Sequence, residues 1–440
     1  MAGEYSTRAR AALATFGLSV HDDAPGAPDM QAHAHAIDQR VAFGQSALVI
    51  GPSGAGKSTL LRALAKRTGA TDVAALAHAA CARTSRVIDL FTGPIPETLR
   101  LLASAGLADA RVFVRRASDL SDGQRARLGI ALAMSCTANT IILDEFCSGL
   151  DAATARSLCC TLTRWLDRSR HTRIICATAR DEVRHWLAPA LLVHVQWGGG
   201  ILYTQPPAAP AQSHIDPPVI EPGDLADYYA LAPLHYRAGR PATIRRILRA
   251  REASTTVGVL VTSMPTLNGS WRPRAFAHRY SRGSPRERAA LLNREVRCIS
   301  RIIIDPRYRG RGIASALVRF YLRNPETAAT EAVAAMGAAC PLFTRAGMTE
   351  WSLLPSPRDR RLTRTLAELG HTAADLAAIQ PRTRTKRDPR LARALRTWAN
   401  AARSTRPLIH DPEAIARAAS HSLAGRGRAY TWSTPSSLQI

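Results

Sequence analysis

A short apolar run, a glycine-rich loop and a helical pattern follow one another near the start of this chain. Residues 47–50 read Ala-Leu-Val-Ile, residues 51–59 read Gly-Pro-Ser-Gly-Ala-Gly-Lys-Ser-Thr, and a helical leucine pattern follows. A buried strand, a glycine loop and a helix start occur in the order that a phosphate-binding P-loop requires. Glycines let the loop wrap a phosphate chain, so that backbone N–H groups and the positive end of the helix face it. The segment predicts a nucleotide site in a parallel sheet covered by helices.

The polar residues of this loop have predictable roles. The Lys57 ammonium is expected to reach the β- and γ-phosphates, where it acts in catalysis, and the Ser58 hydroxyl is expected to ligate Mg²⁺. The residues of the loop expected to bind nucleotide are Gly51, Ser53, Gly54, Gly56, Lys57, Ser58 and Thr59.

Three later segments identify the kind of P-loop protein. They are residues 120–124 (Leu-Ser-Asp-Gly-Gln), the apolar run 141–143 with Asp144 and Glu145 after it, and residues 148–151 (Ser-Gly-Leu-Asp). In this order they resemble the signature, Walker B and D-loop of the ATP-binding-cassette (ABC) family. The resemblance implies that Asp144 holds Mg²⁺ and that Glu145 polarises the attacking water as the catalytic general base.

The same resemblance implies how two chains assemble. Ser121 and Gly123 are expected to contact the γ-phosphate at a partner's P-loop, and Gln124 and Asp151 are also expected to bind nucleotide. One P-loop and one signature per chain then imply an ATP-dependent, head-to-tail homodimer.

The chain departs from the family at three points. No glutamine occurs between Gln45 and Gln124, so the usual Q-loop is absent, and Ala179 stands where the family has its switch histidine. Slow hydrolysis and no membrane subunits are therefore expected. No convincing aromatic residue for stacking on adenine precedes the P-loop.

The second half of the chain carries another glycine loop. A strand-like run over 296–304 leads into residues 305–314 (Asp-Pro-Arg-Tyr-Arg-Gly-Arg-Gly-Ile-Ala), and a helix is predicted from 313 to 322. The loop resembles the acyl-CoA-binding motif of GNAT acetyltransferases, and residues 341–348 resemble the family's C-terminal signature. The resemblance implies binding of acetyl-CoA or another acyl-CoA by Ile304, Arg309, Gly310, Arg311, Gly312, Ile313 and Ala314. Physically, loop N–H groups at a helix N-terminus can hold a pyrophosphate.

The acid and base of an acyl transfer are less defined. The candidates are Glu295, Tyr308, His235 and Tyr236, and each of them is also a plausible solvated or structural residue. The succession of segments over 41–354 resembles a subgroup in which a GNAT domain follows a cassette ATPase. Its GNAT part is distantly similar to the Mom-type phage proteins that modify adenine in DNA. A non-catalytic loop that binds a polyanion is the alternative.

The predicted fold is an α/β P-loop ABC-type ATPase domain, an α+β GNAT domain and a basic helical tail. The predicted boundaries are an N-terminal segment over 1–40, the ATPase over 41–204, a proline-rich linker over 205–218, the GNAT domain over 219–354 and an Arg-rich helical tail over 355–440. The tail holds 16 basic and 6 acidic residues, and the whole chain has 59 basic and 34 acidic residues, a net charge of +25.

Charge and architecture together suggest a substrate. Clustered guanidinium groups bind phosphate backbones, so an ATPase coupled to N-acylation of DNA or RNA is predicted. Two alternatives stay open: a protein or small-amine acetyltransferase with regulatory ATP binding, and a non-catalytic ATPase of the DNA-maintenance type.

The eight cysteines show no C-x-x-C or zinc-finger spacing, and no apolar run approaches the roughly 18 residues that a membrane helix needs. A cytoplasmic location is expected.

Overall fold

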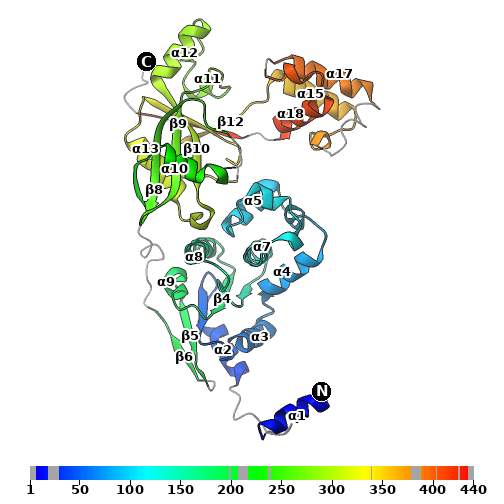
Figure 1. The fold of residues 1–440 in the computed structure, drawn as a ribbon, viewed down its shortest axis with the longest axis vertical. Helices are drawn as coiled ribbons and strands as arrows, with labels where there is room; N and C mark the ends of the chain where they lie inside the picture. Colours follow the sequence, from blue (N-terminus) through cyan, green and yellow to red (C-terminus); the bar gives the residue numbers. More distant parts are fainter. Residues whose placement is uncertain are drawn as a thin grey trace. The chain divides into compact units, whose positions relative to one another are not determined.

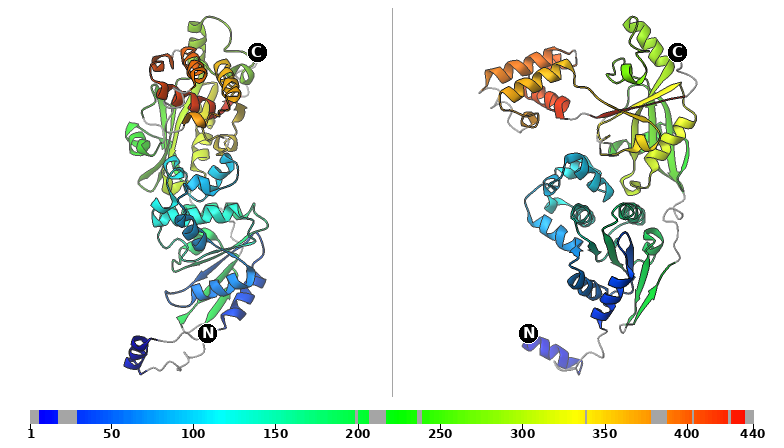
Figure 2. Two further views of the ribbon diagram at one scale, coloured as in Figure 1. Left: turned by 90° about the vertical axis from the view of Figure 1, so that its right-hand side faces the viewer. Right: turned by 180° about the vertical axis from the view of Figure 1, so that it is seen from behind.

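The computed structural model describes residues 6–17, 29–197, 200–206, 217–235, 239–337, 339–377, 388–402, 404–424 and 427–434 (Figure 1). The chain forms two compact units. Unit 1 comprises Met1–Thr92 with Leu101–Asp216, and unit 2 comprises Pro217–Ile440 with Gly93–Arg100. Two further views of the ribbon are given in Figure 2.

Unit 1 is built on a six-stranded sheet. In spatial order its strands are β2 (Thr71–Asp72), β3 (Thr140–Leu143), β4 (Arg173–Thr178), β1 (Ser46–Ile50), β5 (Leu191–Val195) and β6 (Ile201–Thr204). The first five strands are parallel and β6 is antiparallel to β5. Every residue of β1, β3 and β4 is buried, as expected for parallel strands covered on both faces. The strands expected from the apolar runs before the P-loop and before Asp144 are confirmed.

Helices cover this sheet. The helices of this unit are α2 (Met30–Arg40), α3 (Lys57–Thr68), α4 (Val73–Ala82), α6 (Ala110–Phe113), α7 (Asp122–Ser135), α8 (Ala152–Leu166) and α9 (Val183–Leu187). The helix α1 (Thr7–Thr15) precedes them in the sequence. The residues of α5 (Ile95–Ser104) are divided between the two units. Ala34 and Ile37 of α2 are fully buried in the same core as β1 and α3. The core of unit 1 therefore begins before residue 41, where the sequence placed the start of the ATPase.

Arg173, at the start of β4, fixes α2 to the sheet. Its buried guanidinium donates to the carbonyls of Asp38 and Val41 at 2.8 and 2.9 Å and to Thr140 Oγ1 at 3.0 Å, and it pairs with the Asp38 carboxylate. Hydrogen-bonded acceptors on every side offset the cost of burying the charge.

Unit 2 contains a seven-stranded sheet. Its spatial order is β12 (Thr349–Ser352), β13 (Arg428–Ser433), β11 (Ala329–Ala334), β10 (Val296–Ile304), β9 (Thr255–Ser263), β8 (Ile244–Glu252) and β7 (Val219–Pro222). Only the pair β10 and β11 is parallel among these described strands. The helix α13 (Ile313–Arg323) packs on one face, and α10 (Leu225–Leu231) contributes to a separate core with β8, β9 and β10. The helices α11 (Arg272–Ala275), α12 (Pro285–Glu295) and α14 (Leu342–Arg345) complete this part. The expected strand 296–304 and the expected helix 313–322 are confirmed.

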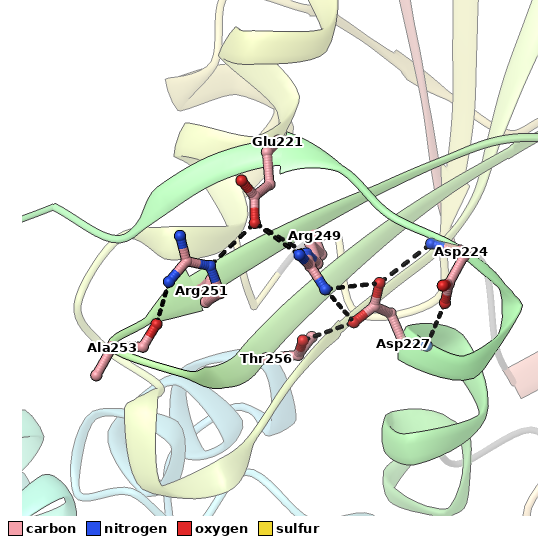
Figure 3. A network of polar contacts seen from close by, with 7 residues as sticks. All are labelled: Glu221, Asp224, Asp227, Arg249, Arg251, Ala253 and Thr256. Atoms are coloured by element: carbon pink, nitrogen blue, oxygen red, sulfur yellow. Dashed lines mark hydrogen bonds and ion pairs between the residues drawn. The ribbon is translucent and has the colours of Figure 1, made fainter.

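The edge strand β7 is held by a network of charges that Figure 3 shows. Glu221 of β7 pairs with Arg249 and Arg251 of β8 at 2.9 and 3.0 Å. Arg249 also reaches Asp227 of α10 at 3.2 Å, and Asp227 accepts from Thr256 of β9 at 2.6 Å. Burial alone would raise the pKa of Asp227, but the bonds from Thr256 and Arg249 hold that pKa below its usual value.

The segment 355–440 departs from the expected helical tail. Three helices, α15 (Pro357–Glu368), α17 (Pro389–Asn400) and α18 (Pro412–Ala424), lie together (Figure 1) and share a core that includes Leu362, Leu395, Trp398 and Ile415. The chain then returns as β13, which lies inside the sheet between β12 and β11. The helices therefore form an insertion between two neighbouring strands, which we call the helical insertion (residues 355–424).

Candidate functional site

The P-loop of unit 1 surrounds a cavity of about 370 Å³ at the carboxyl end of β1. It is lined by Ser53, Gly54, Gly56, Lys57, Ser58, Thr59, Arg62, Asp144, Glu145, Ser148, Thr178 and Ala179. Gly56 precedes α3 at φ 98°, and a Cβ there would lie 3.0 Å from Met30 Cε, so the turn into the helix favours glycine. The cavity unites the predicted P-loop residues, apart from Gly51, with the two carboxylates of Walker B.

Lys57 is oriented by the loop that it belongs to. Its Nζ donates to the carbonyl oxygens of Gly51 and Pro52, each at 2.8 Å. The ammonium thus lies at the loop that faces the start of α3, where both the helix dipole and loop N–H groups favour an anion.

The two Walker B carboxylates follow β3 in different ways. Asp144 Oδ1 accepts from the Glu145 backbone N–H at 2.9 Å. Glu145 has φ 48°, a left-handed conformation that costs energy for a residue with a Cβ, and the next residue is anchored by Phe146 N donating to Ala177 O at 2.7 Å. The strained turn places both carboxylates at the cavity. Ala179, which follows β4, faces the same cavity with a methyl group that forms no hydrogen bond.

Arg180 holds the D-loop, a role that sequence reasoning missed. Its Nη1 donates to the carbonyls of Leu150 at 2.6 Å and Cys147 at 3.2 Å, while Nη2 pairs with Glu182 at 2.8 Å. The pKa of Glu182 is lowered by its hydrogen bond from Arg180. An arginine directly after the position of the switch histidine was the available signal.

The signature residues are placed by a helix start. Ser121 caps α7 and forms a capping box with Gln124. A Cβ on Gly123 would lie 3.1 Å from Leu150 Cδ2, so the signature packs against the D-loop of its own chain. Ser121, Gly123 and Gln124 are absent from the lining of the P-loop cavity. Asp151 caps α8 and accepts from Thr154 N and Oγ1 at 3.0 and 2.6 Å.

The second predicted loop lies between β10 and α13 of unit 2. β10 ends at Ile304, Arg309 Nε donates back to the Ile304 carbonyl at 3.2 Å, and α13 begins after Gly312 with Ile313 and Ala314 in its first turn. Gly312 has φ 84°, which favours glycine, and nothing lies within 4 Å of its missing Cβ. The turn leaves open space at the N-terminus of an 11-residue helix.

Arg311 is the most unusual side chain of this loop. Its side chain is 1% exposed and pairs with Glu252 at 2.5 Å, and its guanidinium lies 5.4 Å from the centre of the Tyr308 ring. Its Nε and Nη1 are buried without a hydrogen-bond partner. Buried charged donors that lack acceptors are costly, so these two atoms mark a position suited to an anion.

The strands β10 and β11 separate beside this loop. Their parallel register runs from Val296–Ala329 to Ile299–Ala332 and stops there, although β10 continues to Ile304. The pairing of β10 with β9 shifts between Ile299 and Arg301. Parallel strands that part at their carboxyl ends leave β10 backbone groups unpaired on that side.

Of the candidate residues for acyl transfer, Tyr308 lies at the loop and Glu295 lies away from it. Glu295 precedes β10, nine strand residues from the loop, a separation of roughly 30 Å at about 3.3 Å per residue. Arg279 donates to it at 2.8 and 3.0 Å, and these hydrogen bonds lower the pKa of Glu295. Tyr308 lies in the loop itself, His235 follows the short helix Ala232–Leu234, and Tyr236 lies outside the described residues. The structure gives Glu295 a structural ion pair.

A second carboxylate in unit 2 is also structural. Glu331 of β11 is buried and pairs with Arg272 at 2.6 Å, and the side chains are 2% and 3% exposed. Trp271 Nε1 donates to the same carboxylate at 3.2 Å. Burial, together with the charge of Glu331, raises the pKa of the neighbouring Cys298 thiol to about 12.

None of the described helices is long and apolar enough to cross a membrane.

The known proteins named below are each similar to at most half of this chain. No protein-family model matches the chain. The methionine import ATP-binding protein MetN of Bradyrhizobium diazoefficiens is 30% identical over 267 residues, which cover 50% of this chain and 75% of that protein. A methionine import ATP-binding protein of Rhodococcus jostii is 31% identical over 195 residues, which cover 34% of this chain and 54% of that protein, so the chain spans about half of its length. A bacterial ABC transporter cassette solved as a dimer has 18% identity and a TM-score of 0.31, over 38% of this chain and 87% of that one.

Proposed function

The chain belongs to the ATP-binding-cassette family, and on this premise we propose that it is an ATPase coupled to an acyl-CoA-dependent N-acyltransferase that acts on nucleic acid. The nucleotide half rests on the cavity that joins the P-loop to Asp144 and Glu145. The transferase half rests on one observation, the two buried and unpartnered donors of Arg311 at the N-terminus of α13. Unlike the import proteins to which it is similar, the chain is proposed to work without membrane subunits.

In unit 1 the proposed reaction is hydrolysis of ATP. The P-loop N–H groups and Lys57 hold the β- and γ-phosphates, and Ser58 and Asp144 hold Mg²⁺. Glu145 accepts a proton from the attacking water, which forms a bond to the γ-phosphorus as the bond to the ADP oxygen breaks. Ala179 carries no hydrogen-bonding group, so Glu145 and the fixed D-loop have to position the water without a switch histidine.

The position of the signature residues supports the proposed assembly of two chains into a dimer. Ser121 and Gly123 lie at the start of α7 with the positive end of a 14-residue helix behind them, and they do not line the P-loop cavity of their own chain. A head-to-tail homodimer brings the signature of one chain to the γ-phosphate bound by the other. ATP then binds both chains and stabilises the dimer by mass action.

In unit 2 the residues present fit the pyrophosphate of an acyl-CoA. Arg311 offers two buried donors, and a guanidinium binds phosphate oxygens with charge-assisted hydrogen bonds. The loop from Arg309 to Ala314 adds backbone N–H groups at the helix start. The opening between β10 and β11 offers strand-edge backbone groups to an extended chain such as pantetheine.

The transfer itself is an acyl substitution. When bound, acetyl-CoA supplies an acyl thioester, so that an acceptor amine forms a C–N bond as the C–S bond breaks and the amine proton passes to the departing thiolate. The contribution of this chain is to bind and orient the acyl-CoA. Arg311 and the loop hold its pyrophosphate, and the separated strands β10 and β11 hold its pantetheine chain. Tyr308, His235 and Tyr236 remain candidates for moving the proton.

The helical insertion supports nucleic acid as the acceptor. Ser352 at the end of β12 pairs with Arg428 at the start of β13, which also pairs with Ala334 at the carboxyl end of β11. The insertion is therefore attached at the same end of the sheet as the loop after β10. The arginines exposed on the outer faces of α15 and α17 are Arg360, Arg361, Arg364, Arg390, Arg393 and Arg396. Arginines on two neighbouring helices suit a phosphate backbone.

A transfer assay tests this proposal. Purified full-length protein is incubated with acetyl-labelled acetyl-CoA, ATP and Mg²⁺, together with duplex DNA, single-stranded DNA or tRNA, and label in the nucleic acid is measured. The proposal expects label that is lost in Gly312→Glu and decreases when Arg361, Arg364, Arg393 and Arg396 are all changed to Gln. Label that appears only in added protein or in free amines would contradict it.

A further inference from the structure

An exposed tryptophan rests on the P-loop of unit 1. Trp197 lies two residues after the end of β5 and is 71% exposed, which is rare for so large an apolar side chain. A Cβ placed on Gly54 would lie 3.2 Å from Trp197 Cη2 and 3.5 Å from Cζ3. The tip of the indole thus touches the phosphate-binding loop, while most of the side chain stays in solvent.

Trp197 also lines a second cavity beside the phosphate pocket. This cavity has a volume of about 580 Å³, which is the size of small-molecule sites in general. Gly51 and Pro52 of the P-loop form part of its wall, and Ala179 lines both cavities. The polar residues that line this cavity together with Trp197 are Asp181, His194, Gln196 and Thr204. A flat apolar face with polar groups around it is what a nucleobase requires.

The order of the strands sets which part of a nucleotide reaches this cavity. β1 lies between β4 and β5, and the Mg²⁺ side of the site, with Asp144 and Glu145, is at the end of β3 beyond β4. Trp197 lies at the end of β5, on the other side of the P-loop. With the phosphates in the P-loop and the terminal phosphate toward β3, the base extends toward β5, where ligands bind at the carboxyl ends of parallel strands.

Another exposed aromatic residue near β1, Phe43, lies at the opposite end of the sheet from the P-loop. Phe43 precedes β1 and is 53% exposed, but the Arg173 guanidinium at the start of β4 lies 5.4 Å from the centre of its ring. Gly44 N donates to Thr172 O, which places this segment at the amino ends of the strands. Phe43 cannot reach a nucleotide bound at the carboxyl ends.

We infer that Trp197 is the stacking platform for the base of the nucleotide bound at the P-loop. This assignment rests on the proposed nucleotide binding and adds a base subsite downstream of the P-loop, whereas the sequence shows no convincing aromatic residue for stacking upstream of it. Stacking is available to every nucleobase because each has a π-face, so Trp197 should strengthen ATP and GTP binding alike. Selectivity between bases would come from the polar wall of the cavity.

The test separates the base from the phosphates. Binding of ATP, GTP and inorganic tripolyphosphate, each with Mg²⁺, is measured by calorimetry on full-length wild type, Trp197→Ala, Trp197→Phe and Phe43→Ala. The Trp197→Ala variant should weaken ATP and GTP by about five- to 150-fold, with tripolyphosphate unchanged. Trp197→Phe should recover most of the loss, and Phe43→Ala should bind like the wild type.

Three results would overturn the assignment. Unchanged ATP affinity in Trp197→Ala removes the stacking role. An equal loss for ATP and tripolyphosphate shows that Trp197 supports the P-loop and not the base. A wild type that binds none of the three ligands refutes the proposed nucleotide site together with this subsite, whereas either of the first two results, obtained with a wild type that binds tripolyphosphate, refutes the subsite alone. Because Trp197 is mostly exposed, an unchanged thermal melt is expected and confirms that the variant is folded.

Discussion

Replacing Arg311 with methionine should remove most of the affinity for acetyl-CoA and leave unit 2 folded. The Arg311 side chain is 1% exposed, and its Nε and Nη1 have no partner. Hydrogen bonds to charged groups contribute about 1.5–3 kcal/mol each, so two such bonds to a pyrophosphate contribute about 3–6 kcal/mol. The lower value corresponds to a loss of about 150-fold in affinity.

The same substitution should cost little stability. Methionine fills much of the volume of the arginine stem, and the two unsatisfied donors disappear with the guanidinium. Glu252, which loses its ion pair, keeps 29% of its side chain exposed and can be solvated. The unfolding midpoint of the variant should therefore stay close to that of the wild type.

Calorimetry with two ligands measures this prediction. Acetyl-CoA carries the pyrophosphate and acetyl-pantetheine lacks it, so Arg311→Met should weaken only the first. Arg307→Met is the matched control, because Arg307 belongs to the same loop, is 53% exposed and pairs with Asp305 at 2.7 Å. Wild-type affinity for acetyl-CoA in Arg311→Met would refute the assignment of the loop.

Further predictions concern ATP-dependent dimerisation, the buried ion pair of Glu331 and stability at low pH. Glu145→Gln should retain bound ATP and convert the protein to a dimer in size-exclusion chromatography with ATP and Mg²⁺; a monomer that has demonstrably bound ATP would contradict the head-to-tail arrangement. Arg272→Met leaves the Glu331 carboxylate buried without its partner and should lower the free energy of unfolding in urea by about 3–5 kcal/mol; adding Glu331→Gln should restore part of it. The Arg279 pair holds the pKa of Glu295 below 4.5, so its contribution to stability is present above that pH and is lost as the pH falls through the folded pKa. Glu295→Gln should flatten the acid side of the stability profile, and an unchanged slope would show that the pair contributes nothing.

The sequence predicted the local geometry of both loops because each is encoded in adjacent residues. Glycines at 54, 56 and 312 adopt the positive φ values that such turns require. The strand before the first loop is apolar from 47 to 50, and the strand before the second loop ends in three isoleucines, 302–304. The capping box of Ser121 with Gln124 is likewise a short-range pattern. Such features depend on a few neighbouring side chains and need no knowledge of the rest of the fold.

Contacts between residues far apart in the sequence account for the features that the sequence did not predict. β13 is more than 70 residues from β12 in sequence, and nothing local in residues 428–433 indicates that they enter the sheet between β12 and β11. Trp197 meets Gly54 only because β5 lies beside β1. The position of Glu295 before a strand suggested a catalytic role, yet the register of that strand puts it at the end away from the loop. The orphaned donors of Arg311 arise from burial, which a sequence does not display.

Mass spectrometry of nucleosides tests the central claim most directly. DNA and RNA are isolated from cells that express the wild type, Lys57→Ala or Gly312→Glu, digested to nucleosides and compared. We predict an acylated nucleoside in the wild type that is absent in Gly312→Glu and reduced in Lys57→Ala. No mass shift in any nucleoside of the wild type, while the purified protein still binds acetyl-CoA and ATP, would contradict a nucleic-acid acceptor.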